Sequence, residues 1–185
     1  MIHTTRTSLG RHERAHKDAR DIEPIIPTTN YWMSCPITFD HLDGRASIRH
    51  EGSDALVLDP IIDEYHLTHV LMDGGSRLDL IYEDTVRGMG IDSFRISKIH
   101  TTFEGVIPGV EAYNKGSVIL EVTFGSLGNS RSKELVFMIA PFQSIYQALL
   151  GRAAFARFNA LPHYGCLTLK MPSPRGAITI SRITV

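Results

Sequence analysis

Apolar and polar residues alternate along much of the chain after residue 53, and this period of two is typical of β-strands with one buried face. The alternation is clearest over residues 117–124, where every second residue is apolar: Val118, Leu120, Val122 and Phe124. Other apolar runs predict strands over residues 54–58, 67–72, 96–103, 135–139 and 166–171, the last ending at Pro172. The first two are predicted to form a hairpin through the polar turn at Asp63 and Glu64. The pattern therefore predicts a mainly β protein.

Two short helices are predicted among these strands. The first is predicted over residues 82–87 and would end at Gly88 or Gly90. Residues 153–159 suit the other, shortly after an apolar run that ends at Leu150.

The chain divides by composition into three parts. Residues 1–30 are polar and hold too few apolar side chains to offset the entropy lost on ordering, so we expect a disordered tail or linker there. Prolines punctuate the stretch that follows, and residues 31–52 are predicted to be a connector. Residues 53–182 are then one domain, a size sufficient for a hydrophobic core.

Composition and charge exclude several classes of protein. The 185 residues have a formal net charge of -1, so nothing in the overall charge favours direct binding of nucleic acid or a membrane surface. The two cysteines, Cys35 and Cys166, form no Cys-x-x-Cys pair, and the sequence contains neither a membrane-length apolar run nor an apolar signal core. We therefore expect an intracellular, cytoplasmic protein. His12 and His16 have helical spacing but no third ligand in view, so no metal site is predicted.

One carboxylate stands out from this background. The apolar run Val70–Met72 leads directly to Asp73, which is followed by Gly74, Gly75 and Ser76. An acidic residue at the end of a buried strand costs free energy unless it is paired, hydrogen-bonded or functional. Glycines allow another chain or a substrate to approach the backbone closely. The simpler alternative is a hairpin corner, because Asp-Gly is common in such turns.

A second motif favours the functional interpretation of Asp73. Downstream, Ala148–Leu150 is again an apolar run, and Gly151 and Arg152 follow it before the predicted helix. An apolar strand ending in Asp-x-Gly, with a later apolar-apolar-Gly-Arg before a short helix, resembles the retropepsin-like aspartic proteases. The similarity is greatest to the protease segment of plant gypsy-type long-terminal-repeat retrotransposon polyproteins. It covers roughly residues 53–180, and the tail from Ala160 to Pro172 is similar to these elements in particular.

The resemblance implies a fold and a set of functional residues. The fold would be a small closed β-barrel of the acid protease type, with a flap hairpin and one or two short helices. Asp73 would be the catalytic carboxylate in the active-site loop of Gly74, Gly75 and Ser76. The flap would span residues 101–115. The tip of the flap would be Ile107, Pro108 and Gly109. The residues that support the active-site loop from behind would be Leu150, Gly151 and Arg152.

The same resemblance implies an activity. The chain would be an aspartic endopeptidase that cleaves a polypeptide, chiefly the retroelement's own polyprotein, without metal or cofactor. Because the domain has one such aspartate, a catalytic pair requires a homodimer. Residues 1–30 would then be the remainder of a linker from an upstream structural protein.

Some residues depart from the family pattern. Retropepsins usually have Ser or Thr in place of Gly74, and that hydroxyl bonds across the dimer, so Gly74 predicts a looser loop and a weaker dimer. Arg77 and Leu78 are larger than expected and would crowd a subsite. The alternative is therefore a degenerate, non-catalytic domain for dimerisation or peptide binding. A third possibility is an unrelated small β-protein with an Asp-Gly turn.

Three further side chains are assigned structural roles. Asp79 is predicted to cap the start of the helix that follows it. Arg152 is predicted to pair with a loop carboxylate, with Asp79 as the candidate. Tyr164 is predicted to be a packing or turn residue.

Overall fold

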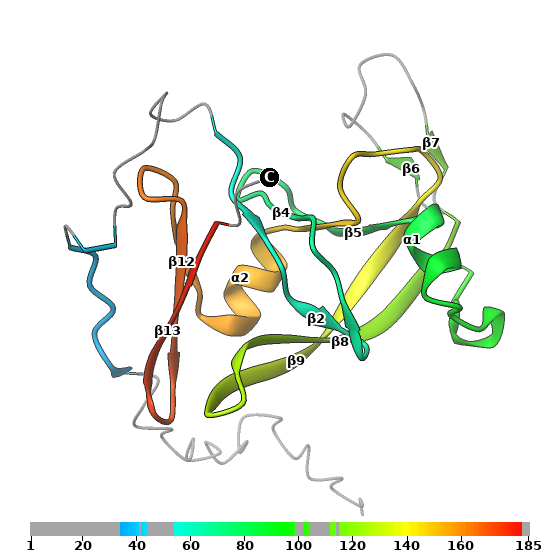
Figure 1. The fold of residues 1–185 in the computed structure, drawn as a ribbon. Coiled ribbons are helices and arrows are strands. Elements are labelled where there is room, and N and C mark those ends of the chain that lie inside the picture. The colour runs from blue at the N-terminus through cyan, green and yellow to red at the C-terminus, as the bar shows by residue number, and fades with distance from the viewer. Residues whose placement is uncertain are drawn as a thin grey trace, which may run out of the picture.

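A computed structural model describes residues 34–40, 42–43, 54–98, 102–103, 112–113 and 115–182. The predicted tail at residues 1–30, most of the connector and the predicted flap tip at Ile107, Pro108 and Gly109 lie outside these residues. The described strands form an eight-stranded sheet with the order β1-β4-β10-β5-β9-β8-β2-β3, a three-stranded sheet β11-β12-β13 and the two-stranded pair β6-β7. The large sheet curls into a half-barrel (Figure 1). The prediction of a mainly β chain is confirmed.

The first strands form a nested hairpin. Strand β1 (Val57–Leu58) pairs antiparallel with β4 (Val70–Met72), and between them β2 (Ile61–Ile62) pairs with β3 (Tyr65–His66). The turn of the inner hairpin is Asp63 and Glu64, with φ of 49° and 74°. Two central residues of positive φ suit the right-handed twist of the flanking strands. The predicted hairpin is confirmed, with one additional pair of strands inside it.

The two longest strands of the large sheet form one antiparallel hairpin. Strand β8 (Ser117–Ser126) pairs antiparallel along its whole length with β9 (Asn129–Ala140). The alternating apolar residues of β8 are all buried, as predicted: Val118, Leu120, Val122 and Phe124. Gly125, with φ of 103°, is required at the hairpin end because a Cβ there would lie 2.2 Å from the Asn129 carbonyl oxygen.

The segment between β4 and β8 contains shorter elements. Strand β5 (Asp79–Tyr82) leads into α1 (Glu83–Gly88), and a short 3-10 helix spans Ser93–Arg95. Of the strand predicted over residues 96–103, the structure has a bridge at Ser97 and β6 (Thr102–Phe103), which pairs with β7 (Ala112–Tyr113).

Strand β10 (Ala148–Leu150) joins two distant parts of the chain. It lies parallel to β4 on one side and antiparallel to β5 on the other, while β5 is parallel to β9. This interleaving brings the two apolar runs singled out in the sequence into register, with Leu150 opposite Met72. Both side chains are buried in the main hydrophobic cluster. The ends of β4 and β10, where Asp73 and Gly151 follow, therefore lie side by side.

Helix α2 (Arg152–Phe158) follows β10 and ends at Asn159, a left-handed residue with φ of 49°. Its length is close to that predicted. Figure 1 shows α2 between the large sheet and the strands β12 and β13. Its buried residues Ala154, Phe155 and Phe158 fill this space.

The C-terminal sheet was only partly predicted. It consists of β11 (Leu161–His163), β12 (Thr168–Ser173) and β13 (Gly176–Ser181). The prediction that Pro172 ends the middle strand is wrong, because Pro172 lies within β12 opposite Ala177. Strand β11 reaches only as far as Lys170, so β12 has a partner on one side alone at Pro172, a position where proline is tolerated.

Arg131 connects this C-terminal sheet to the rest of the domain. Its buried guanidinium donates hydrogen bonds to the carbonyl oxygens of Phe158, at the end of α2, and of Pro172, the latter at 2.9 Å. It also lies over the Phe158 ring, 5.6 Å from the centroid. Burial lowers the pKa of Arg131.

Candidate active site

Asp73 is positioned by backbone hydrogen bonds at the end of β4. Its N–H donates to the carbonyl oxygen of Leu150 at 2.9 Å, so β10 holds the first residue of the loop. The Ser76 N–H closes the turn on the Asp73 carbonyl oxygen at 3.2 Å. The Asp73 side chain is half-buried, and its Oδ1 accepts a hydrogen bond from the Gly75 N–H at 2.8 Å. The loop thus presents one carboxylate with a defined orientation beside two glycines.

Gly151 is packed directly against the back of this loop. A Cβ at Gly151 would lie 2.5 Å from the Leu78 carbonyl oxygen and 2.8 Å from that of Ser76, so no larger residue fits. The next residue, Arg152, donates its backbone N–H to the same Ser76 oxygen at 2.9 Å. The structure therefore brings together the two motifs that the sequence singled out.

The buried side chain of Asp79 bonds Gly151 behind the Asp73 loop. It is 4% exposed, and its Oδ1 accepts a hydrogen bond from the Gly151 N–H at 2.7 Å. Burial raises the pKa of Asp79 to about 6, while hydrogen bonds from the backbone of Gly151 and Ala154 act in the opposite direction. A buried carboxyl is thus placed six residues after Asp73.

The structure corrects two predictions about these side chains. Asp79 does not cap α1, because the residue before that helix is Tyr82 and no side chain caps it. Asp79 also accepts its hydrogen bond from the backbone of Gly151 rather than from Arg152. The Arg152 side chain is exposed, and it makes no ion pair among the described residues. Arg152 donates a hydrogen bond to the loop through its backbone N–H.

Tyr164 is a site residue that the sequence analysis missed. Its hydroxyl oxygen accepts a hydrogen bond from the Gly74 N–H at 2.9 Å, across 90 positions of sequence. We expected Gly74 to loosen the loop, yet its N–H has a partner within the same chain. No local pattern could have identified the contact, because it depends on how the C-terminal sheet packs beside α2.

Several described residues in and after the loop are exposed. Gly75, Arg77 and Leu78 are all exposed, Leu78 by 41%. Strands β6 and β7 pair antiparallel, with Thr102 opposite Tyr113, within the range where the flap was predicted.

Asp43, followed by glycine like Asp73, has a different environment. Its carboxylate lies 2.6 Å from the ammonium of Lys170 on β12, and this hydrogen bond is the main cause that lowers the pKa of Asp43. The carboxylate of Asp43 thus bonds Lys170, and that of Asp79 bonds Gly151. Neither of these hydrogen bonds is made to Asp73.

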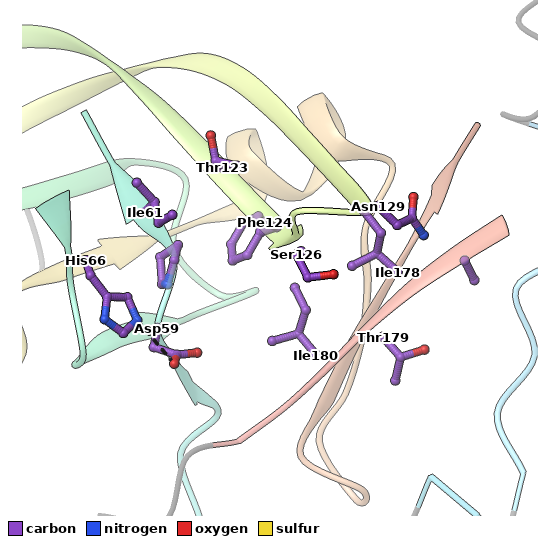
Figure 2. A pocket seen from close by; sticks show the side chains of 13 residues that line it. Asp59, Ile61, His66, Thr123, Phe124, Ser126, Asn129, Ile178, Thr179 and Ile180 are labelled. Carbon is purple, nitrogen blue, oxygen red and sulfur yellow. Dashed lines mark hydrogen bonds and ion pairs between the residues drawn. The ribbon is translucent and has the colours of Figure 1, made fainter. Parts of the chain in front are cut away.

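A separate cavity of about 610 Å³ lies between the inner hairpin, the end of β8 and β13. Figure 2 shows His66 beside Asp59 at one end, with Ile178, Thr179 and Ile180 at the other. His66 Nε2 lies 3.3 Å from Asp59 Oδ2. Neither Asp73 nor Tyr164 lines this cavity, so it is distinct from the loop site.

The described part of the chain contains neither a cluster of metal ligands nor a membrane-spanning helix. No group of three His, Cys, Asp or Glu side chains is arranged to hold a metal ion there. Within the same residues, no helix has the length and apolar character needed to cross a membrane.

Comparison with known proteins identifies the fold. No protein-family model and no curated protein match the sequence. Among solved structures, the chain is similar to the retroviral protease-like domain of Ddi1 from Leishmania major, with a TM-score of 0.51 and 12% identity, covering 71% of this chain and 95% of that one. The predicted retropepsin-like fold is thus confirmed in its mainly β architecture, curled sheet and few short helices.

Two further structures give weaker matches. A retropepsin-like aspartic protease from Rickettsia conorii has a TM-score of 0.45 and 14% identity, with 66% of this chain and 83% of that chain covered. The EIAV protease in complex with an inhibitor has a TM-score of 0.43 and 16% identity, with 69% and 99% covered.

Proposed function

We propose that residues 53–182 form an aspartic endopeptidase domain in which Asp73 is the catalytic carboxylate. The observation that carries this proposal is the loop itself. In a retropepsin-like fold, a half-buried aspartate lies beside two glycines at the end of a buried strand. Its N–H donates to the Leu150 carbonyl oxygen, and the Arg152 N–H donates to the Ser76 carbonyl oxygen of the same loop. The apolar-Asp-x-Gly and apolar-Gly motifs meet there, which a simple hairpin corner does not require.

In the aspartic-protease mechanism, peptide hydrolysis uses two carboxylates that share one proton. The ionised carboxylate removes a proton from water, which attacks the peptide carbonyl carbon, while the protonated carboxyl donates a hydrogen bond to the carbonyl oxygen. Transfer of a proton to the amide nitrogen then allows the C–N bond to break. Two carboxylates at close range cannot both ionise readily, so the pair titrates as a unit. With one Asp73 per chain, the pair requires a homodimer with a two-fold axis.

The proposed substrate is a polypeptide bound in extended form between the Asp73 loops and the flaps. The paired strands β6 and β7 would be the base of each flap, with Ile107, Pro108 and Gly109 at its tip. By the resemblance described above, the substrate would be the polyprotein of a plant gypsy-type retrotransposon. No metal or organic cofactor takes part in this chemistry.

Cleavage of a mixed peptide library at about pH 5 tests the proposal, with wild type and Asp73→Asn compared at high protein concentration. Asp92→Asn, an exposed aspartate outside the loop, is the matched control. We expect cleavage by wild type and the control and none by Asp73→Asn. Cleavage by a folded Asp73→Asn variant at the wild-type rate would refute the assignment.

A non-catalytic dimerisation or peptide-binding domain is the second candidate. Gly74 and the exposed Arg77 favour it, because both depart from the retropepsin pattern. A folded, dimeric wild-type protein that cleaves no member of the library would favour this candidate over the enzyme.

A further inference from the structure

The hydrogen bond between Gly74 and Tyr164 joins the candidate catalytic loop to the C-terminal sheet. The Gly74 N–H, immediately after Asp73, donates to the Tyr164 hydroxyl oxygen at 2.9 Å. The next N–H along the chain, that of Gly75, donates to the Asp73 side chain. Two consecutive backbone donors therefore fix the loop, one through the catalytic aspartate and one through a tyrosine from elsewhere in the chain.

Tyr164 also limits the space for a side chain at position 74. A Cβ at Gly74 would lie 3.0 Å from the Tyr164 hydroxyl oxygen, which is closer than an ordinary van der Waals contact. Tyr164 Cζ would be 4.0 Å from that Cβ, and Phe155 Cε2 3.4 Å. Gly74 is not among the glycines with positive φ, so its backbone conformation is open to other residues. The close approach of one hydroxyl, rather than backbone strain, therefore favours glycine here.

The segment that carries Tyr164 is itself held in place. Tyr164 follows β11, and the N–H of Cys166 turns back to His163, donating to its Nδ1 at 3.0 Å. The His163 ring packs on Phe39 with 4.9 Å between centroids. On the neighbouring strand, Lys170 forms its short ion pair with Asp43. The tyrosine is thus presented from a tethered turn.

We propose that Tyr164 is a positioning residue for Asp73, and that Gly74 and Tyr164 act as a matched pair. The tyrosine hydroxyl braces the loop within one subunit, and the glycine leaves room for it. The order of the loop then does not depend on a hydroxyl from a partner subunit at position 74. This inference rests on the proposed function for its catalytic consequence, but the brace itself is a property of the folded chain.

A double-mutant cycle tests the pair, with Gly74→Ser, Tyr164→Phe and the double variant compared with wild type. Tyr65→Phe is the control, since Tyr65 is similarly exposed, at 46% against 40% for Tyr164, and lies on β3 away from the loop. The readouts are the thermal midpoint, hydrogen exchange of the Gly74 amide by NMR, and kcat and KM for peptide cleavage.

We expect Tyr164→Phe to speed exchange of the Gly74 amide and lower kcat, each by about three- to tenfold, the range of one net hydrogen bond. KM should stay within about twofold, because the lost bond acts on the loop rather than on substrate. Gly74→Ser should lower the thermal midpoint in the wild-type background and be tolerated in the Tyr164→Phe background, where the crowding oxygen is gone. Tyr65→Phe should change none of these quantities.

Two results would overturn the inference: unchanged exchange of the Gly74 amide in Tyr164→Phe, or an equal effect of Gly74→Ser in both backgrounds. Failure of the proposed function gives a different result. If wild type cleaves no peptide, amide exchange and the thermal midpoints still decide whether Tyr164 braces the loop.

Discussion

The two sides of the Asp73 loop are held in contrasting ways. On the side of β10 and α2, the loop itself is contacted by backbone groups, and the Asp79 carboxyl bonds the Gly151 N–H behind them. Gly151 approaches the loop so closely that no side chain fits between. On the side of the C-terminal sheet, the loop is held by one side-chain hydroxyl, that of the partly exposed Tyr164.

The contacts at Gly151 are required by the fold, whereas the hydrogen bond to Tyr164 can be removed without changing the strands. Backbone contacts at Gly151 depend on the crossing of β4, β10 and β5, and a change there disturbs the core of the domain. The bond from Tyr164 can be removed by deleting one oxygen atom while leaving every strand in place. We therefore expect substitutions on the first side to alter stability and substitutions on the second to alter mainly the loop.

Gly151→Ala is expected to have the largest effect. The new Cβ would meet two carbonyl oxygens of the loop, those of Leu78 and Ser76, at distances that require the backbone to move. We expect the free energy of unfolding to fall by about 3 kcal/mol or more, at the upper end for an overpacked core. Denaturant titration measures it.

Gly88→Ala is the control for this substitution, because a Cβ at Gly88 meets nothing within 4 Å and the residue lies in α1. It should be neutral or stabilising by about 0.5–1 kcal/mol. Equal stability of Gly151→Ala and wild type would contradict the close approach of Gly151 to the carbonyl oxygens of Ser76 and Leu78.

Asp79→Asn is expected to have a smaller effect that depends on pH. The pKa of Asp79 is about 6 in the folded chain and 3.8 in its ordinary environment. Between these values the folded state holds the proton more tightly than the unfolded state, so stability falls as pH rises from about 4 to about 6. The asparagine cannot titrate but can still accept from the Gly151 N–H.

Wild type should therefore lose about 1–3 kcal/mol relative to Asp79→Asn as pH rises from about 4 to about 7, since one pKa unit corresponds to about 1.4 kcal/mol. Denaturant titration across this range measures the difference, with Asp92→Asn, at an exposed position, as the control for removal of one carboxylate. Parallel curves for wild type and Asp79→Asn would contradict a raised pKa for Asp79.

The backbone-held side of the loop is the part that the sequence predicted. Its signals are local: an apolar run that ends in Asp73, a second run that ends in Gly151, and the alternation along β8. The strands follow from their periodicity, so nearby residues suffice to find them. That Leu150 and Gly151 pack behind the Asp73 loop was implied by the resemblance to retropepsin-like proteases. The helix predicted over residues 153–159 lies at residues 152–158.

The side held by Tyr164 could not be predicted in the same way. Strand β11 is three residues long and contains Pro162, and β12 continues through Pro172, so both break the usual sequence pattern of a strand. The roles of Tyr164 and Asp79 arise from contacts with residues 90 and 72 positions away, and no local periodicity records such contacts. Propensity suggested a helix cap for Asp79, but burial beneath Gly151 determined its role.

The central claim is that one Asp73 from each of two subunits forms the catalytic pair. It is tested most directly by mixing wild type with Asp73→Asn at constant total protein, allowing subunits to exchange, and measuring peptide cleavage. If both aspartates are needed, an equal mixture should retain about one quarter of the wild-type rate, because only dimers of two wild-type subunits are active. Retention of about one half would contradict the account, since each wild-type subunit would then act independently of its partner.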